Sequence, residues 1–266
     1  SLHSALAIPQ LLIDMQTGEV LFEEDAGVPW HPASLTKLMT ALLAFEAIER
    51  GEVRLSTPVI TTANALNVAP SKMGFPVDTA ITLEDALYLL IIKSANDIAV
   101  AIGETVSGSE ARFVEMMNRR AAEMGLDATH FVNPHGLHDP GQISSARDIA
   151  IIALTIRARY PQYNAMFETR TVEHGQTRSH TNNELLTRFA GTNGMKTGYV
   201  CASGLNIVAT AERNGRHLMA ITLGANSARE RGELTARLLY SGFAGGYRGT
   251  GQGLVSLTNR KGLVPV

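Results

Sequence analysis

Three short motifs combine serine, lysine and asparagine in a pattern that suits acyl transfer. They are Ser34-Leu35-Thr36-Lys37, Ser94-Ala95-Asn96 and Lys196-Thr197-Gly198. A serine hydroxyl is a weak nucleophile until a neighbouring base removes its proton. On a helix, residues i and i+3 lie on the same face, so Lys37 Nζ can meet Ser34 Oγ. The first motif therefore predicts a nucleophile, Ser34, that has its own general base, Lys37.

The second and third motifs can complete such a site. A lysine acts as a base only where burial or a neighbouring cation lowers its pKa, and Lys196 can be that cation. Ser94 can relay a proton to a leaving amine, and Asn96 can hold a substrate amide. The Lys196-Thr197-Gly198 strand offers a cation, a hydroxyl and an open backbone edge, which suit a peptide that ends in a carboxylate. Free N–H groups at the first helical turn favour an oxyanion.

Composition excludes several other classes of function. The 266 residues carry 23 basic and 25 acidic side chains, a net charge of −2, which argues against a nucleic-acid partner. The longest apolar run, residues 86–92, is far shorter than the roughly 20 residues that span a bilayer. Cys201 is the one cysteine, so an internal disulfide and a cysteine zinc cluster are excluded. Lysine is scarce, and two of the five lysines, Lys37 and Lys196, lie in the motifs.

Strands at both ends of the chain flank a helical middle. Strands are predicted at 7–15, 19–23, 195–200, 204–212 and 216–223. Helices are predicted at 32–50, 82–93, 96–106, 109–124, 146–158 and 228–240, with residues 52–81 irregular. Asn214-Gly215 is a strong signal for a hairpin turn. This order predicts an α+β fold: an antiparallel sheet built from both termini, helices that cover it, and an inserted, mostly helical subdomain at about 52–165.

The two ends of the chain suggest how the protein is organised. Residues 1–243 are predicted to form one catalytic unit, with its cleft between the sheet and the helical subdomain. Residues 244–266 are glycine-rich and are predicted to be a flexible tail or the start of a linker. The chain opens on Ser1 without a methionine, which fits a trimmed, exported product.

The motif set resembles the penicillin-binding proteins and serine β-lactamases, which share S-x-x-K, S-D-N and K-T-G motifs. Within that group, the chain resembles the low-molecular-mass penicillin-binding proteins, which are serine-type D-alanyl-D-alanine carboxypeptidases. The resemblance covers residues from about 8 to 243 and is carried by the segments 32–40, 133–137, 144–148 and 194–199. It implies a β-lactamase/transpeptidase-like fold.

The resemblance also implies a role for each motif residue. Ser34 would form the acyl-enzyme, Lys37 would be the base and Ser94 would shuttle a proton. Backbone N–H groups of Ser34 and Tyr199 would form the oxyanion hole. The residues implied in substrate binding are Asn96, Lys196, Thr197, Gly198, Tyr199 and Arg231, the last placed near the product carboxylate.

The substrate implied by the resemblance is a peptidoglycan stem peptide that ends in D-Ala-D-Ala. β-Lactam antibiotics would be covalent inhibitors, and no metal or organic cofactor is implied. The implied location is outside the cytoplasm, in the periplasm or cell envelope. Members of this group often carry a second β-rich domain and an amphipathic anchor, so contact with a membrane surface is expected only through segments outside this chain.

Departures from the family pattern bear on the alternatives. The second motif has Ala95 where S-D-N has an aspartate, and the carboxypeptidases often have a small residue there. A class A β-lactamase also needs a glutamate for deacylation, but residues 129–139 contain none, and Glu184 comes only twelve residues before Lys196. We therefore expect slow β-lactam hydrolysis. A class A-like β-lactamase, a D,D-endopeptidase with the same site and a catalytically silent envelope-binding protein remain as alternatives.

Two further groups of residues have chemical potential. His130, His135 and His138 lie close together, but no H-E-x-x-H or similar pair accompanies them. We expect them to order a loop beside the cleft and not to bind a metal. Cys201 follows the third motif by three residues and is expected to be a small buried side chain.

Overall fold

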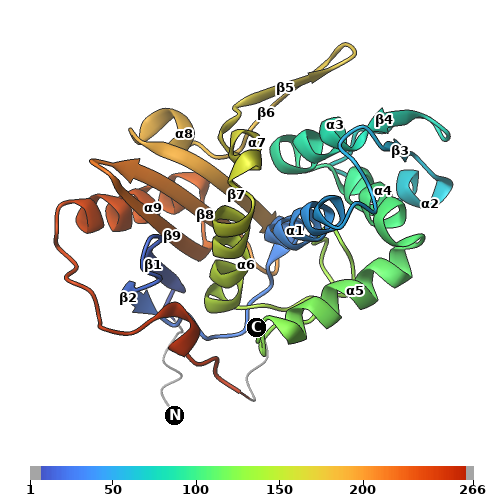
Figure 1. Ribbon diagram of the computed structural model, residues 1–266. Coiled ribbons are helices and arrows are strands. Elements are labelled where there is room, and N and C mark those ends of the chain that lie inside the picture. Colours follow the sequence, from blue (N-terminus) through green and yellow to red (C-terminus); the bar gives the residue numbers. More distant parts are fainter. Residues whose placement is uncertain (1–6, 262–266) are drawn as a thin grey trace.

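A five-stranded antiparallel sheet forms the centre of the molecule (Figure 1). The computed structural model describes residues 7–261. In spatial order β2-β1-β9-β8-β7, the strands are Val20–Glu24, Gln10–Asp14, Arg216–Ala225, Gly204–Arg213 and Thr192–Val200. Because β1 pairs with β9, the two ends of the chain share one sheet. The predicted α+β fold is confirmed.

Side chains on the strands alternate between two hydrophobic cores, as the pleat requires. On one face, Ile207 and Ala209 pack beneath α9 (Ala228–Phe243). On the other, Val208 joins the larger core formed with α1 (Thr36–Glu49) and α6 (Ala146–Arg159). Both faces of the sheet are thus covered by helices (Figure 1).

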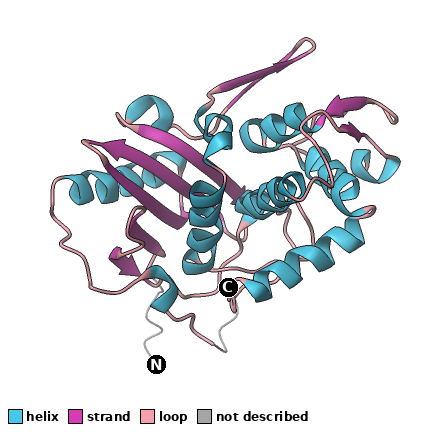
Figure 2. Cartoon of the chain, viewed as in Figure 1, coloured by secondary structure: helices cyan, strands magenta, loops and turns pink. Residues whose placement is uncertain are grey.

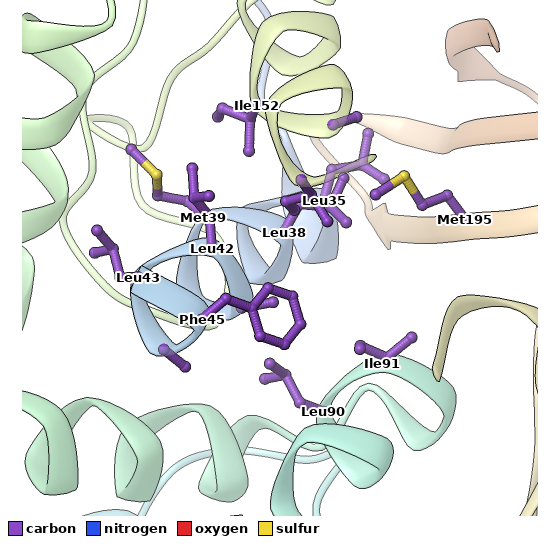
Figure 3. Close-up of a cluster of buried hydrophobic side chains, with 14 of the residues drawn as sticks. Leu35, Leu38, Met39, Leu42, Leu43, Phe45, Leu90, Ile91, Ile152 and Met195 are labelled. Carbon is purple, nitrogen blue, oxygen red and sulfur yellow. The ribbon is translucent and has the colours of Figure 1, made fainter. Parts of the chain in front are cut away.

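Helix α1 is buried along most of its length, which explains why its sequence is apolar on every side. Figure 3 shows its side chains meeting those of three other elements: Ile152 of α6, Leu90 and Ile91 of the neighbouring helical segment, and Met195 of β7. A helix fixed on all sides gives a rigid support to any functional residue in its first turn. Lys37 lies in this first turn, and its side chain is buried.

The helical part lies beside the sheet (Figure 2). It contains α2 (Ala63–Leu66), α3 (Leu83–Tyr88), a π-helix η2 (Leu89–Lys93), α4 (Asn96–Ser107) and α5 (Glu110–Glu123). The two-stranded β3 (Pro58–Ile60) and β4 (Ala80–Thr82) lie within the segment predicted to be irregular. Side chains of Thr82, Ser109 and Ser145 cap the helices that follow them, as their types predict. No helix in residues 7–261 is long and apolar enough to cross a membrane.

A separate two-stranded hairpin, which the sequence did not predict, projects beside the helical part (Figure 1). It consists of β5 (Thr171–His174) and β6 (Thr177–His180) and packs against η2. The His174 ring lies against the Phe75 ring, with centroids 5.1 Å apart. The remaining short helices are η1 (Ala33–Leu35), η3 (Pro161–Tyr163), α7 (Asn164–Glu168), α8 (Leu185–Arg188) and η4 (Leu254–Ser256).

The segment after α9 differs from the flexible tail that its glycines predicted. Residues 244–261 run back along the body of the protein (Figure 1). Thr250 Oγ1 donates to the Val20 carbonyl at 2.7 Å, and the Leu254 side chain is buried. Asn259 Nδ2 donates to the buried Asp148 carboxylate at 2.9 Å. Specific polar and apolar contacts therefore fix this segment despite its composition, while residues 262–266 of the predicted tail lie outside the described part.

Candidate active site

The three predicted motifs meet at one cleft between the sheet and the helical part. The cleft has a volume of about 450 Å³. Its lining includes Ser34, Ser94, Asn96, Thr197, Gly198, Tyr199 and Arg231. Lys37 and Lys196 lie beneath this surface with exposed fractions of 1% and 3%. A larger hollow of about 660 Å³ between α8 and α9 contains none of the three motifs, so the motif residues gather at the smaller cleft.

Ser34 and Lys37, the predicted nucleophile and base, lie together at the start of α1. Lys37 Nζ lies 2.9 Å from Ser34 Oγ, and it donates to Asn96 Oδ1 and to the His135 carbonyl, each at 2.8 Å. Burial lowers the pKa of Lys37 well below its ordinary value, and the charge of Lys196 lowers it further. This environment favours the neutral amine, the form that can accept a proton.

The three partners of Lys37 also fix the direction of its lone pair. A neutral amine has two N–H bonds and one lone pair. The Asn96 amide oxygen and the His135 carbonyl can only accept, so they take the two N–H bonds. The lone pair is then left to face the hydroxyl of Ser34, which is the geometry that general-base catalysis requires.

Ser94 and Lys196 form a second pair from opposite walls of the cleft. Lys196 Nζ donates to Ser94 Oγ at 3.0 Å and to the Thr197 carbonyl at 2.8 Å. Burial, and next the charge of Arg231, lower the pKa of Lys196 to about 7. Ser94 ends η2 in the left-handed region at φ 57°, a strained conformation for a serine. Both protonation states of Lys196 are thus accessible near neutral pH.

Two glycines allow other parts of the chain to approach the backbone around Ser34 closely. A Cβ at Gly198 would lie 2.7 Å from the Ser34 nitrogen, so β7 approaches Ser34 at a distance that only glycine permits. Gly136 has a φ of 101°, and a Cβ there would collide with the Ala33 carbonyl. The backbone N–H of Ser34 therefore lies beside β7, where the oxyanion hole is predicted.

Asn96, which is predicted to hold a substrate amide, also bonds to groups of the protein itself. Its Oδ1 accepts from Lys37, and its Nδ2 donates to the Ala69 carbonyl at 3.0 Å. One N–H of this amide stays available to a substrate. The next residue, Asp97, was missed by the sequence analysis. Its buried carboxylate accepts from the Met73 and Gly74 N–H groups at 3.0 and 2.8 Å and so holds the segment that directly follows Pro70 and Ser71, which line the cleft.

Comparison with known proteins identifies the family. Residues 3–227 match the family described as D-alanyl-D-alanine carboxypeptidase. The chain belongs to this family. Relatives include D-alanyl-D-alanine carboxypeptidase DacF of Bacillus subtilis, 32% identical over 88% of this chain, and DacD of Escherichia coli, 34% identical over 86%. The chain spans 61% of the length of each.

Solved structures agree with this assignment. Penicillin-binding protein 5 from Haemophilus influenzae superposes with a TM-score of 0.86 at 32% identity, covering 92% of this chain and 72% of that one. Penicillin-binding protein D2 from Listeria monocytogenes, in an ampicillin-bound form, gives a TM-score of 0.81 at 27% identity and covers 91% and 100%. The family and fold that the motifs resembled are confirmed.

Arg231 lines the cleft, but its side chain is already hydrogen-bonded within the protein. Its Nη2 donates to Glu184 Oε2 at 3.1 Å and to the Asn182 carbonyl at 3.3 Å. Glu184 thus forms an ion pair with Arg231 and does not line the cleft. The residues that line the cleft include no aspartate or glutamate. A role for Arg231 toward a substrate carboxylate stays a prediction.

Two of the three histidines make hydrogen bonds within their loop, and the ring of His138 packs edge-on against the ring of His31. His135 Nδ1 accepts from the Leu137 N–H at 3.0 Å, and His130 Nδ1 donates to the Gly141 carbonyl at 2.9 Å. Burial, and next the charge of Lys37, lower the pKa of His135 to about 3, so it is neutral. Residues 7–261 contain no group of three or more side chains that could hold a metal ion.

The expectation that Cys201 is buried is wrong. It lies in the turn between β7 and β8, and its side chain is exposed. Its Sγ is 3.5 Å from the Tyr199 hydroxyl, which is also exposed. The apolar character of a free cysteine was outweighed by its position in a surface turn.

Proposed function

We propose that this chain is the catalytic unit of a serine D-alanyl-D-alanine carboxypeptidase that removes the terminal D-alanine from peptidoglycan stem peptides. The observation that carries the proposal is the pairing of two serines with two buried lysines in one cleft: Ser34 with Lys37 and Ser94 with Lys196. The names of the relatives as D-alanyl-D-alanine carboxypeptidases and the ampicillin bound to the Listeria protein support it.

Acylation begins when neutral Lys37 takes the proton of the Ser34 hydroxyl. Ser34 Oγ then forms a bond to the carbonyl carbon of the penultimate D-alanine, and the carbonyl electron pair moves onto its oxygen. The backbone N–H groups of Ser34 and Tyr199 stabilise this oxyanion. Such preorganised donors typically contribute a factor of about 10²–10³ in rate.

Collapse of the intermediate breaks the carbon–nitrogen bond and releases D-alanine. The leaving amine takes the Ser94 proton, and the ammonium form of Lys196 replaces that proton. Lys196 then regains a proton and Lys37 loses one, so the site returns to its starting charge. A water gives its proton to Lys37 and attacks the ester. Ser34 leaves with that proton, and the shortened peptide is released.

Substrate specificity in this proposal rests on the wall formed by β7. The peptide lies along the strand edge, and its terminal carboxylate meets Lys196 and Thr197, with Arg231 behind them. One N–H of Asn96 holds a peptide carbonyl. A β-lactam presents the same carboxylate and acyl group and is trapped as an ester on Ser34. Because no carboxylate lines the cleft to activate water, we expect this ester to hydrolyse slowly.

The substrate sets the location. Stem peptides lie in the bacterial cell wall, so the proposed enzyme works after export, in the periplasm or cell envelope, where trimming of these peptides affects cell shape. Membrane association, in this proposal, depends on segments beyond the part of the relatives that this chain covers.

The direct test is D-alanine release from a defined pentapeptide muropeptide. We expect stoichiometric release that Ser34→Ala abolishes. A cross-linked dimer is assayed in parallel, because a D,D-endopeptidase would cleave the cross-link through the same acyl-enzyme. Failure to release D-alanine while cleaving the dimer would replace the proposal by an endopeptidase. Rapid turnover of benzylpenicillin would replace it by a β-lactamase.

A further inference from the structure

Gln142 lies behind the cleft and makes an unusually complete set of hydrogen bonds. Its side chain is 1% exposed. Its Oε1 accepts from the Val132 N–H at 2.6 Å and from the Asn133 N–H at 3.1 Å. Its Nε2 donates to Thr36 Oγ1 at 3.0 Å and to the Asn133 carbonyl at 3.1 Å. Both lone pairs and both N–H bonds of the amide are therefore used.

These four bonds join the two segments that must be in register for the base to work. Thr36 immediately precedes Lys37 in the first turn of α1. Val132 and Asn133 begin the loop that carries His135, whose carbonyl accepts from Lys37. The buried Gln142 amide thus connects α1, which carries Lys37, to the loop whose His135 carbonyl orients the Lys37 amine.

The connection from Gln142 to the His135 carbonyl is short and made of hydrogen bonds. Asn133 Oδ1 accepts from the His135 and Gly136 N–H groups at 3.2 and 2.7 Å, and its Nδ2 donates to the Leu137 carbonyl at 3.1 Å. Asn133 therefore shapes the turn at 135–137, and Gln142 holds the backbone of Asn133 on both sides.

We infer that Gln142 is a positioning residue for acylation, which sets the His135 carbonyl against Lys37 and thereby aims the Lys37 lone pair at Ser34. Gln142 touches neither substrate nor Ser34, so it acts through the loop. The inference rests on the proposed function, since it assumes that Lys37 is the base. A displacement of about 1 Å at such a site can cost about 10²-fold in rate.

The chain offers a matched control in Asn118 of α5. This half-buried amide donates to the Phe131 carbonyl and accepts from the Phe131 N–H, each at 2.8 Å. It therefore holds the same stretch of chain one residue before Val132, but it makes no bond to α1. A purely structural role for the amides predicts similar effects at the two positions, whereas a positioning role predicts different ones.

The test measures acylation by a fluorescent penicillin under stopped flow, which separates the acylation rate constant from the binding constant. We expect Gln142→Met, which keeps length but removes all four bonds, to lower the rate constant about 100-fold. The binding constant should change less than about threefold, because the cleft wall is kept. Asn118→Leu should stay within about twofold of the wild type in both constants.

Two outcomes overturn the inference. One is a Gln142→Met protein that acylates within about threefold of the wild type, and the other is an equal loss in Gln142→Met and Asn118→Leu. If Gln142→Met does not fold, Thr36→Val decides, because it removes only the bond to α1. We expect about a fivefold lower rate constant there, and an unchanged one is contrary. A wild type that is never acylated would instead overturn the proposed function.

Discussion

The two serine–lysine pairs of the cleft are built alike but are separated by their surroundings. In each, the lysine is buried and its Nζ lies about 3 Å from a serine oxygen: 2.9 Å for Lys37 and Ser34, and 3.0 Å for Lys196 and Ser94. The first pair is local, three residues apart. The second joins positions 102 residues apart. Similar chemical groups at similar distances thus face different charges.

Burial and neighbouring charge together lower the pKa of both lysines. For Lys37, burial and next the charge of Lys196 lower the pKa well below the ordinary value. For Lys196, burial and next the charge of Arg231, which Glu184 partly balances, lower the pKa to about 7. We infer that Lys37 serves as a base, whereas Lys196 supplies both charge and protons at neutral pH.

The largest effect is expected at Lys37. Lys37→Met removes the amine that faces Ser34, and Lys196 cannot replace it because Lys196 bonds to Ser94. We expect β-lactam acylation to fall about 10⁴-fold, the upper range for loss of a general base. Stopped-flow acylation measures it, with Lys72→Met as the control, since Lys72 Nζ donates to the Leu66 carbonyl outside the cleft. If Lys37→Met lowered the acylation rate less than about tenfold, Lys196 could replace Lys37 as the base, and the contrast between the two lysines would be wrong.

A smaller effect, with a defined sign, is expected in the pH profile of Lys196. As pH rises through about 7, Lys196 loses its charge, so kcat/KM for a peptide with a terminal carboxylate should fall. We expect about a tenfold fall between pH 7 and pH 8.5. Lys196→Arg keeps the charge and should remove this fall, whatever its absolute activity. A peptide with a terminal amide is the matched control: it still uses the Lys196 proton for its leaving amine, so its fall in the wild type should be smaller than that of the carboxylate peptide.

A profile for Lys196→Arg that matches the wild type would show that another group causes the alkaline fall. An equal fall for the amide peptide would show that the charge of Lys196 does not act on the substrate carboxylate.

The contrast between the pairs also explains what the sequence could predict. The i, i+3 spacing on a helix places Lys37 beside Ser34, so local geometry was sufficient for the first pair. The second pair needed the family resemblance, because no local rule brings residues 94 and 196 together. The strands at both ends, with Asn214-Gly215 between two of them, predicted the sheet correctly.

Other parts of the site left no signal in the sequence. The third partner of Lys37 is a backbone carbonyl, that of His135, and backbone atoms carry no sequence signature. Gln142 is one glutamine in a loop, and its four bonds arise only from tertiary packing. The tail was misjudged because glycine content describes freedom of the backbone and not the contacts that restrain it, such as the buried Leu254.

The central claim is that Ser34, activated by Lys37, is the residue that becomes acylated. Mass spectrometry of the intact protein after addition of benzylpenicillin, followed by peptide mapping, tests it most directly. We predict one adduct per chain, mapped to Ser34, persisting through slow hydrolysis and absent in Ser34→Ala. An adduct on Ser94, or none while the protein is folded, would contradict the assignment of the two pairs.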